Sequence, residues 1–388
     1  MCASMKILYD HQAFTMQYFG GVSKSFCELI SHLPKDVSVE IGVLQSNNVH
    51  LVQSGLCPML EAVKLDYKTF LPHFYFKGKG HLYLWFNRLF PSFPSVEHVN
   101  KRRTVELLQS GDFDVFHPTF FDDYFLSYLN GKPFVLTVHD MMPELFPQYF
   151  NRNDLQIVGK RKLVEKANAI IAVSKQTKQD LMEILKVPED KIKVIYHGGP
   201  VCEKISNKAL IDEPYFLYMG TRDKYKNFHQ LIVDFSKFSD NCKKTVLVCT
   251  GGEFTRQEKE AFKKYNILDR VVHFSATDEN VKNLYAHAVA FVYPSLYEGF
   301  GMPILEAFAY GCPVLLNNKS CFPEIAGNAG IFFLSDNGGS DLVEKLEIAF
   351  SWSDEERKSI IQLGYEKLKF YSWQKSAKQL KDLYESII

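Results

Sequence analysis

The sequence predicts an α/β protein made of two doubly wound domains, each with a parallel sheet that helices cover on both faces. The main observation is that short apolar segments alternate with segments whose apolar residues recur at helical spacing. This alternation stops in the stretch 198–214, which begins with Gly-Gly-Pro, and then restarts. Strands separated by helices pair in parallel, and parallel sheets are buried on both faces. The length of 388 residues suits two such domains at roughly 100–200 residues each.

The first half of the chain shows strand and helix signals in turn. A loop that carries Gly20-Gly21 follows the first strand, and the apolar residues of 22–33 then recur at helical spacing. Ser174 stands where it would cap a helix over 175–185. The strands expected in this half are 5–10, 37–43, 114–116, 134–138, 169–173 and 192–195.

The second half repeats the pattern and ends in helical segments. The expected strands are 215–219, 245–249, 271–274, 289–293 and 313–316. The expected helices are 227–238, 255–265, 279–287, one that begins near Pro303, and a last one at 373–387. We therefore divide the chain into an N-terminal domain over 1–200, a C-terminal domain over 201–370 and a terminal helix over 371–388.

Charge and composition exclude several classes of protein. The chain has 45 basic and 45 acidic residues, and this balance argues against a nucleic acid as the main partner, because phosphate binding needs a cationic excess. The eight cysteines are scattered without a Cys-x-x-Cys pair, which is typical of reduced thiols. No apolar run reaches the ~18–20 residues of a membrane span, and the N-terminus lacks the apolar core of a signal peptide. We expect a cytoplasmic protein.

The segment 293–316 carries the strongest chemical signal. A strand ends at Pro294, a loop with Gly299 and Gly301 follows, and Pro303 stands where a helix would begin. The glycines let backbone amides approach a ligand, and a helix N-terminus favours an anion such as a diphosphate. The sequence has neither a dinucleotide fingerprint after its first strand nor a Walker loop, so a dinucleotide oxidoreductase and a P-loop NTPase are not favoured.

The segment resembles the retaining nucleotide-sugar glycosyltransferases of the GT-B fold (glycosyltransferase family 4, "glycosyl transferases group 1"). The match is Glu298-Gly299-Phe300-Gly301-Met302-Pro303 followed by Glu306, the family's pair of glutamates eight positions apart. The resemblance implies that Glu298 lies beside the transferred sugar and that Glu306 binds the nucleotide ribose. It also implies that the backbone of Phe300, Gly301 and Met302 meets the sugar and the diphosphate, and that the terminal helix crosses back to the first domain.

Two basic residues extend the resemblance into the second domain. Gly220-Thr221-Arg222 follows that domain's first strand, and the family's Arg and Lys near this point hold the donor diphosphate. We assign these roles to Arg222 and Lys226, with Lys224 as the alternative to Lys226. A leaving diphosphate gains negative charge, so fixed cations stabilise it without a metal.

The first domain contributes a histidine and a glycine pair. His139 ends a strand, as does the family histidine that contacts the donor sugar, and Gly20 and Gly21 match glycines where the backbone approaches the donor. The family often has an Arg soon afterwards, but this chain has Ser23-Lys24, so we expect no side-chain contact to phosphate there. The segment 195–198 also matches a family landmark, which we interpret as architectural.

The resemblance implies an enzyme that transfers a hexose-type sugar from a nucleotide diphosphate sugar to an acceptor hydroxyl with retention of anomeric configuration. We expect no cofactor, and no metal because Arg222 and Lys226 can take the place of a divalent cation at the diphosphate. An inverting reaction with His139 or Asp140 as base stays open. Further alternatives are a sugar-nucleotide epimerase or a phosphorylase of the same fold, or a nucleotide-sugar-binding subunit without activity.

The acceptor implied is a growing surface polysaccharide, a lipopolysaccharide or a lipid-linked glycan. Residues 70–93 contain nine aromatic residues, and 70–103 contain six basic residues against one acidic residue, Glu97. Aromatic and basic residues together suit a lipid headgroup interface. We therefore expect peripheral contact with the inner face of a membrane through 70–103. A core helix pair with a solvated basic edge is the alternative.

Overall fold

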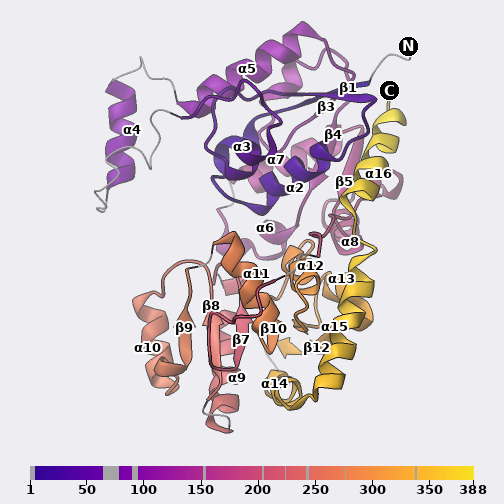
Figure 1. Ribbon diagram of the computed structural model, residues 1–388. Helices are drawn as coiled ribbons and strands as arrows, with labels where there is room; N and C mark the ends of the chain where they lie inside the picture. Colours follow the sequence, from indigo (N-terminus) through magenta and orange to yellow (C-terminus); the bar gives the residue numbers. More distant parts are fainter. Residues whose placement is uncertain are drawn as a thin grey trace.

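The computed structural model folds into two α/β domains, one above the other in Figure 1. It describes residues 5–63, 78–89, 95–151, 154–202, 205–222, 224–241, 244–275, 277–336 and 339–388. The predicted fold class, with helices packed on parallel sheets in both halves of the chain, is confirmed.

The sheet of the N-terminal domain consists of two parallel three-stranded parts with the orders β2-β1-β3 and β4-β5-β6. A parallel bridge between Phe116 and Phe134 joins β3 to β4. The strands are β1 (Met5–Tyr9), β2 (Val37–Ile41), β3 (Val115–His117), β4 (Val135–Val138), β5 (Ala169–Ala172) and β6 (Ile192–Val194). Each lies within one or two residues of its predicted position, since short, strongly apolar segments are the clearest signal of buried strands.

The described residues of this domain form eight α-helices. They are α1 (Gln12–Met16), α2 (Gly21–Ser31), α3 (Val49–Ser54), α4 (Lys79–Leu89), α5 (Val96–Ser110), α6 (Met142–Leu145), α7 (Leu155–Lys166) and α8 (Lys175–Ile184). The expected α2 and α8 are present, and the Ser174 side chain accepts a hydrogen bond from the Thr177 amide as the predicted cap of α8.

Helix α5 was not expected, and its inner face explains why. The residues that it buries include Asn100 and Thr104 besides Leu108. The Asn100 side chain accepts from the backbone amides of Leu44 and Gln45, and Thr104 donates to the Gly42 carbonyl. A helix that packs through polar side chains lacks the apolar period from which helices are predicted.

The C-terminal domain has one parallel sheet of six strands in the order β12-β11-β10-β7-β8-β9. These are β7 (Tyr215–Tyr218), β8 (Val246–Cys249), β9 (Val271–His273), β10 (Ala290–Tyr293), β11 (Val314–Asn317) and β12 (Gly330–Phe333), with a short antiparallel pair β13 (Ser335–Asp336) and β14 (Gly339–Ser340) beyond them. The helices are α9 (Phe228–Asn241), α10 (Arg256–Lys264), α11 (Asp278–His287), α12 (Met302–Ala309), α13 (Phe322–Ala326), α14 (Leu342–Ser351), α15 (Asp354–Leu368) and α16 (Trp373–Glu385). The edge strand β12 was not predicted.

Helix α16 crosses back to the N-terminal domain, as expected. It lies along the side of that domain in Figure 1, and Trp373, Leu380 and Tyr384 belong to the apolar core around β1 and α2. The hydroxyl of Tyr384 lies 2.6 Å from that of Tyr9 on β1 and 2.6 Å from His117 Nδ1 on β3. The terminal helix therefore completes the core of the first domain, while the exact domain boundaries stay a prediction.

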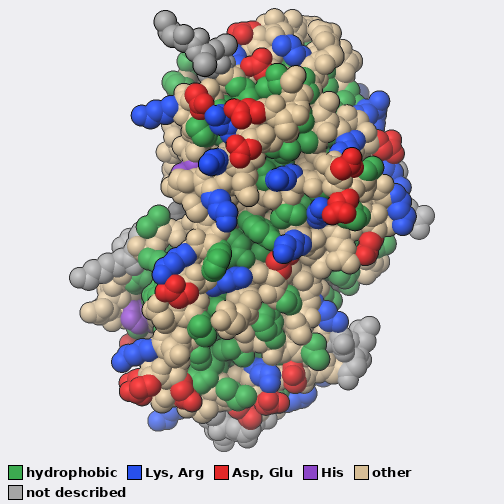
Figure 2. All heavy atoms as spheres, turned by 90° about the vertical axis from the view of Figure 1, so that its right-hand side faces the viewer, with side chains coloured by type: hydrophobic (Ala, Val, Ile, Leu, Met, Phe, Trp, Pro, Cys, Tyr) green, Lys and Arg blue, Asp and Glu red, His purple; other side chains and the backbone are tan. Residues whose placement is uncertain are grey.

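The surface carries both signs of charge. Figure 2 shows the face with α15 and α16, where Lys, Arg, Asp and Glu side chains are interspersed over both lobes. This distribution agrees with the formal net charge of zero. Within the parts of the chain that the structure describes, no helix has the length and apolar character needed to cross a membrane.

Candidate functional site

The loop between β10 and α12 is held from several sides. Gly301 precedes α12 with φ +88°, a conformation that favours glycine, and Pro303 is the second residue of the helix. The Ser320 hydroxyl donates to the Glu298 carbonyl at 2.6 Å, and the Glu298 amide donates back to that hydroxyl at 3.2 Å. The backbone that carries Glu298 is therefore fixed in place.

The side chain of Glu298 forms a largely buried ion pair with Lys226, which lies two residues before α9. Lys226 Nζ lies 2.6 Å from Glu298 Oε1, and the two side chains are 17% and 11% exposed. Burial, and then the Glu298 carboxylate, raise the pKa of Tyr293 well above its usual value, so the phenol stays protonated beside them. The structure thus brings together two of the predicted residues. The side chain of Lys224 lies outside the described residues.

Glu306 on α12 forms an ion pair with the other domain. Lys24 on α2 places Nζ 3.1 Å from Glu306 Oε1, and the Tyr285 hydroxyl donates to Oε2 at 3.5 Å. The sequence did not assign a role to Lys24. The available signal was its position one helical turn after Gly20, because α2 begins at Gly21 and points its first turn toward the second domain.

Gly299 lies against the backbone of His139. A β-carbon at position 299 would stand 1.7 Å from the His139 carbonyl oxygen, so any side chain there would push the two segments apart. The Gly299 carbonyl accepts hydrogen bonds from Ser174 Oγ at 2.6 Å and Thr177 Oγ1 at 3.3 Å. The sequence predicted that Gly299 lets the backbone approach a ligand, but what it approaches in this structure is the N-terminal domain.

The imidazole of His139 packs against the rings of two neighbouring side chains. Its ring lies 5.8 Å from that of Phe26 and is stacked at 5.7 Å on that of His197. The Nε2 atom is buried and has no hydrogen-bond partner among the described residues. Burial lowers the pKa of His139 to about 4, with Asp140 acting to raise it and Lys160 to lower it. At neutral pH the ring is therefore uncharged, with one polar atom that a ligand can satisfy.

The two glycines before α2 differ in their surroundings. A β-carbon on Gly20 would meet the Gln17 side chain at 2.4 Å, whereas one on Gly21 would meet nothing within 4 Å. Gln17 Oε1 accepts from the Ser23 amide and so satisfies one of the first amides of the helix. No packing contact in the described residues requires a glycine at 21.

Arg222 is engaged away from Glu298 and Lys226. Its Nε lies 2.5 Å from Glu258 Oε1, and its terminal nitrogens donate to the carbonyls of Thr250, Gly252 and Glu253. These bonds use four of the five donors of a guanidinium. Arg222 therefore holds the 250–254 loop, and a contact with a diphosphate requires it to give up part of this network.

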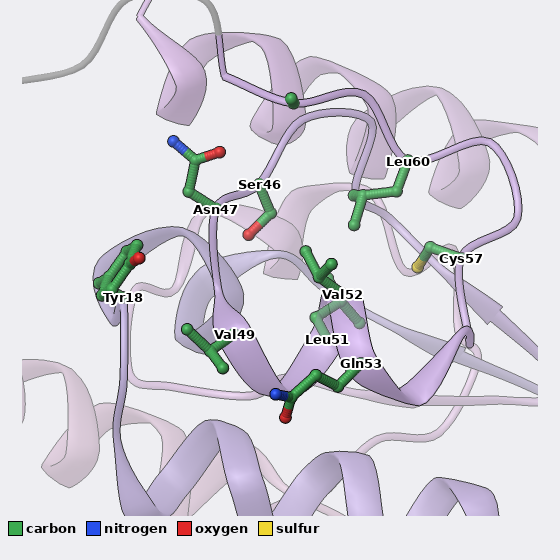
Figure 3. A pocket seen from close by; sticks show the side chains of 10 residues that line it. Tyr18, Ser46, Asn47, Val49, Leu51, Val52, Gln53, Cys57 and Leu60 are labelled. Carbon is green, nitrogen blue, oxygen red and sulfur yellow. The ribbon is translucent and has the colours of Figure 1, made fainter. Parts of the chain in front are cut away.

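A pocket of about 700 Å³ lies in the N-terminal domain beside the loop that leads to Gly20. In Figure 3, Tyr18 and Asn47 lie on one side and Leu60 and Cys57 on the other, so the lining is polar on one wall and apolar on the opposite one. Across the described residues, no three His, Cys, Asp or Glu side chains gather as a possible metal site. Metal independence stays a prediction.

Two family models match the chain and together span nearly all of it. The model described as Glycosyltransferase Family 4 matches residues 19–199, and that described as Glycosyl transferases group 1 matches residues 202–385. Each half of the chain thus matches a glycosyltransferase model of its own.

Curated relatives align over part of their length. The chain is 29% identical over 203 residues to the O-antigen chain mannosyltransferase RfbU of Salmonella typhimurium, covering 52% of this chain and 57% of that protein. It is 26% identical over 270 residues to the O-antigen chain mannosyltransferase B of Escherichia coli, covering 65% of this chain and 70% of that protein. The alignment thus spans little more than half of RfbU.

Solved structures match over the whole chain. Anabaena Alr3699/HepE in complex with UDP and glucose superposes with a TM-score of 0.73 at 14% identity, covering 98% of this chain and 100% of that one. WaaG, a glycosyltransferase involved in lipopolysaccharide biosynthesis, gives a TM-score of 0.66 at 15% identity, covering 98% and 99%. This likeness concerns the fold, and it confirms the GT-B architecture expected from the sequence.

Proposed function

The chain belongs to the glycosyl transferases group 1, or glycosyltransferase family 4, and from this premise we propose that it transfers a hexose-type sugar from a nucleotide diphosphate sugar to an acceptor hydroxyl. The reaction retains the anomeric configuration. The acceptor is a growing surface glycan, in keeping with the relatives that act on O-antigen chains and with WaaG.

The observation that carries this proposal is the meeting of Glu298, Lys226 and His139. A carboxylate and an ammonium lie 2.6 Å apart, and the residue after Glu298 touches the His139 backbone. An ammonium has three donors, and Glu298 takes one of them, so the others are suited to phosphate oxygens. The buried Nε2 of His139 gains a partner when a sugar hydroxyl lies beside it.

The proposed roles follow from charge. As the bond between the anomeric carbon and the diphosphate oxygen breaks, negative charge grows on the diphosphate and positive charge grows on the sugar. Lys226 stabilises the negative charge on the diphosphate and Glu298 stabilises the positive charge on the sugar. These fixed charges are effective because they need no reorganisation during the reaction. The acceptor oxygen bonds to the anomeric carbon on the face that the diphosphate leaves, and its proton passes to a phosphate oxygen.

The remaining predicted residues bind the donor. Glu306 accepts from the ribose hydroxyls in exchange for Lys24, and the amides of Phe300, Gly301 and Met302 meet the sugar and diphosphate. Gly20 and Gly21 cover the donor from the first domain. Arg222 reaches the diphosphate only when Glu258 is released, and otherwise shapes the 250–254 loop for the nucleotide base. No metal or other cofactor takes part in this scheme.

The acceptor side is the N-terminal domain. The pocket beside Tyr18 and Asn47 has room and polar groups for sugar units.

We also propose that the chain works in the cytoplasm, peripheral to the inner face of a membrane, with contact through 70–103. Of this segment, 70–77 and 90–94 lie outside the described residues. The core-helix alternative is disfavoured for α4, since Leu82 and Trp85 are exposed.

The donor proposal is tested by thermal unfolding in the presence of UDP-, GDP-, ADP- and dTDP-sugars. A ligand at 100 times its dissociation constant stabilises the folded chain by about 2.7 kcal/mol. We expect one nucleotide class to raise the melting temperature of the wild type and of Lys237→Ala, which removes an exposed lysine on the following helix α9, and to leave that of Lys226→Ala nearly unchanged. An equal shift in Lys226→Ala, or no shift with any donor, would contradict the proposal.

A further inference from the structure

His197 lies where three parts of the molecule meet. It follows β6 by three residues, its side chain is buried, and it has no place in the reaction scheme above. Its ring is 5.7 Å from that of His139, with planes 20° apart, and 4.9 Å from that of Phe300 in an edge-on contact. A third neighbour is Trp373, whose ring lies 5.6 Å away.

Each of these rings belongs to a different functional part. His139 directly follows β4 in the first domain, and Phe300 lies in the loop before α12, between Glu298 and Glu306. Trp373 is the first residue of α16, where the chain crosses back to the first domain. One imidazole therefore touches the proposed sugar-contacting histidine, the proposed donor loop and the crossing segment at once.

The crossing segments are packed closely around His197. A β-carbon on Gly198 would stand 2.4 Å from the backbone nitrogen of Trp373, and one on Gly199 would stand 2.3 Å from a methyl of Leu368. The Gly199 amide donates to the Tyr371 carbonyl at 3.0 Å. The two segments that join the domains thus lie against each other, and the backbone on either side of His197 has little freedom to shift.

Ring packing fixes the plane of the His139 imidazole. The terminal torsion of a histidine has a broad energy profile, so an imidazole without hydrogen bonds is oriented by its neighbours. No described residue bonds to His139 Nε2, and the rings of Phe26 and His197 lie at 5.8 Å and 5.7 Å from the His139 ring. Phe26 belongs to the first domain, whereas His197 also touches the donor loop.

We propose that His197 is a positioning residue, which orients the His139 ring toward the donor and ties that orientation to the donor loop and the domain crossing. The proposal rests on the proposed function, in which His139 contacts the transferred sugar. His197 acts through the faces and edges of its ring, so its nitrogen atoms are not needed. Trp373 begins the helix that crosses back to the first domain. Because His197 contacts Trp373, the position of the His197 ring depends on how the two domains are arranged.

The test is a double-mutant cycle on the full chain, measured as kcat and KM with saturating acceptor. His197→Leu, which removes the ring, is expected to lower kcat about 10- to 100-fold, since small displacements of a positioned group have effects of this size. His197→Phe, which keeps a ring, is expected to stay within about threefold of the wild type. In a His139→Ala background, His197→Leu is expected to lower kcat less than about twofold, because coupled residues are not additive.

Phe134→Leu provides the matched control, since it alters a buried ring at the opposite end of β4 from His139. Its effect on kcat is expected to be the same in both backgrounds. A second readout is the ring chemical shift of His139, which His197→Leu should move and Phe134→Leu should not. Melting temperatures show whether each variant folds.

The outcomes separate the two proposals. If His197→Leu lowers kcat equally in both backgrounds, or leaves both kcat and the His139 chemical shift unchanged, the positioning role alone is overturned. If His139→Ala itself keeps the wild-type kcat, the sugar-contacting role of His139 fails, and the positioning role fails with it. Loss of activity in His197→Phe equal to that in His197→Leu would also overturn a role that depends on the ring.

Discussion

Three histidines of the N-terminal domain are uncharged at neutral pH. Burial lowers the pKa of His117 to about 3 and that of His139 to about 4. Burial, and then the neighbouring His139, lower the pKa of His197 well below its usual value. His139 and His197 stack on each other, and a proton on either ring would place a charge against the other. The packing of the site therefore depends on neutral imidazoles.

His139 should make the free energy of unfolding depend on pH. Its pKa is about 4 in the folded chain and about 6.5 when unfolded, so the unfolded state takes up the proton first as pH falls. The stabilisation is fully present above pH 6.5 and is lost toward pH 4. Between these values we expect unfolding free energy in urea to fall by about 1.4 kcal/mol per pH unit more steeply in the wild type than in His139→Gln.

The control for this measurement is His98→Gln, which removes an exposed histidine on α5. Its pH dependence is expected to follow that of the wild type. Parallel curves for the wild type and His139→Gln would mean that the His139 ring is accessible to protons in the folded chain, which would contradict the burial of its Nε2 atom.

The residue types at the site were predictable from the sequence, whereas their interaction partners were only partly so. Glu298 and Lys226 were chosen from their motifs, and the structure pairs them. Arg222 was chosen in the same way, but its guanidinium is occupied by Glu258 and three carbonyls that come from a loop about 30 residues away in sequence. Lys24 was discounted, yet it reaches Glu306 across the domains. A motif gives the type of residue at a strand end, whereas its partners depend on packing between distant segments.

At the scale of elements, helix α4 exposes large apolar side chains that the core of the first domain does not cover. Figure 1 shows it at the outer side of that domain. Trp85 is 59% exposed and Leu82 37%, and Arg88 in its last turn is also exposed. Exposed aromatic and basic residues on one helix suit a lipid headgroup surface.

We expect the wild type to sediment with anionic lipid vesicles and a Leu82→Ala, Trp85→Ala variant to bind them at least about threefold less, because each buried side chain of this size contributes about 1.5–3 kcal/mol. Phe370→Ala, which removes an aromatic ring that is 66% exposed in the second domain, is the control and should bind as the wild type does. Equal binding of all three proteins would contradict membrane contact through α4.

Elements were predictable where their signal was apolar and local. The strands β4, β5 and β10 consist almost entirely of buried apolar residues and were placed within one or two residues. Helix α5 escaped because it buries Asn100 and Thr104, and β12 escaped because its burial is partial along most of its length. A helix that packs through polar residues and a partly exposed edge strand lack the periodic apolar pattern from which helices and strands are predicted.

At the scale of the whole molecule, the site is built where the two domains touch. The contact between Gly299 and His139 is accompanied by hydrogen bonds from Tyr297 to Asp180 and from Tyr196 to Glu324, both between segments more than 100 residues apart in sequence. The family resemblance assigned donor-binding residues to both domains, but these direct contacts between the domains were not predicted, because neither side of the interface has a distinctive sequence pattern. Domain contact therefore places the proposed catalytic residues.

The most direct test of the account is the anomeric configuration of the product. The donor found in the thermal screen is incubated with the chain and a lipid-linked glycan acceptor, and the anomeric proton of the new sugar is observed by NMR. We expect the new linkage to have the configuration of the donor, and Glu298→Gln to lower the rate at least about 100-fold, as removal of an electrostatic group at a reacting centre does. An inverted linkage would contradict the retaining reaction, and transfer by Glu298→Gln at the wild-type rate would contradict the role of Glu298.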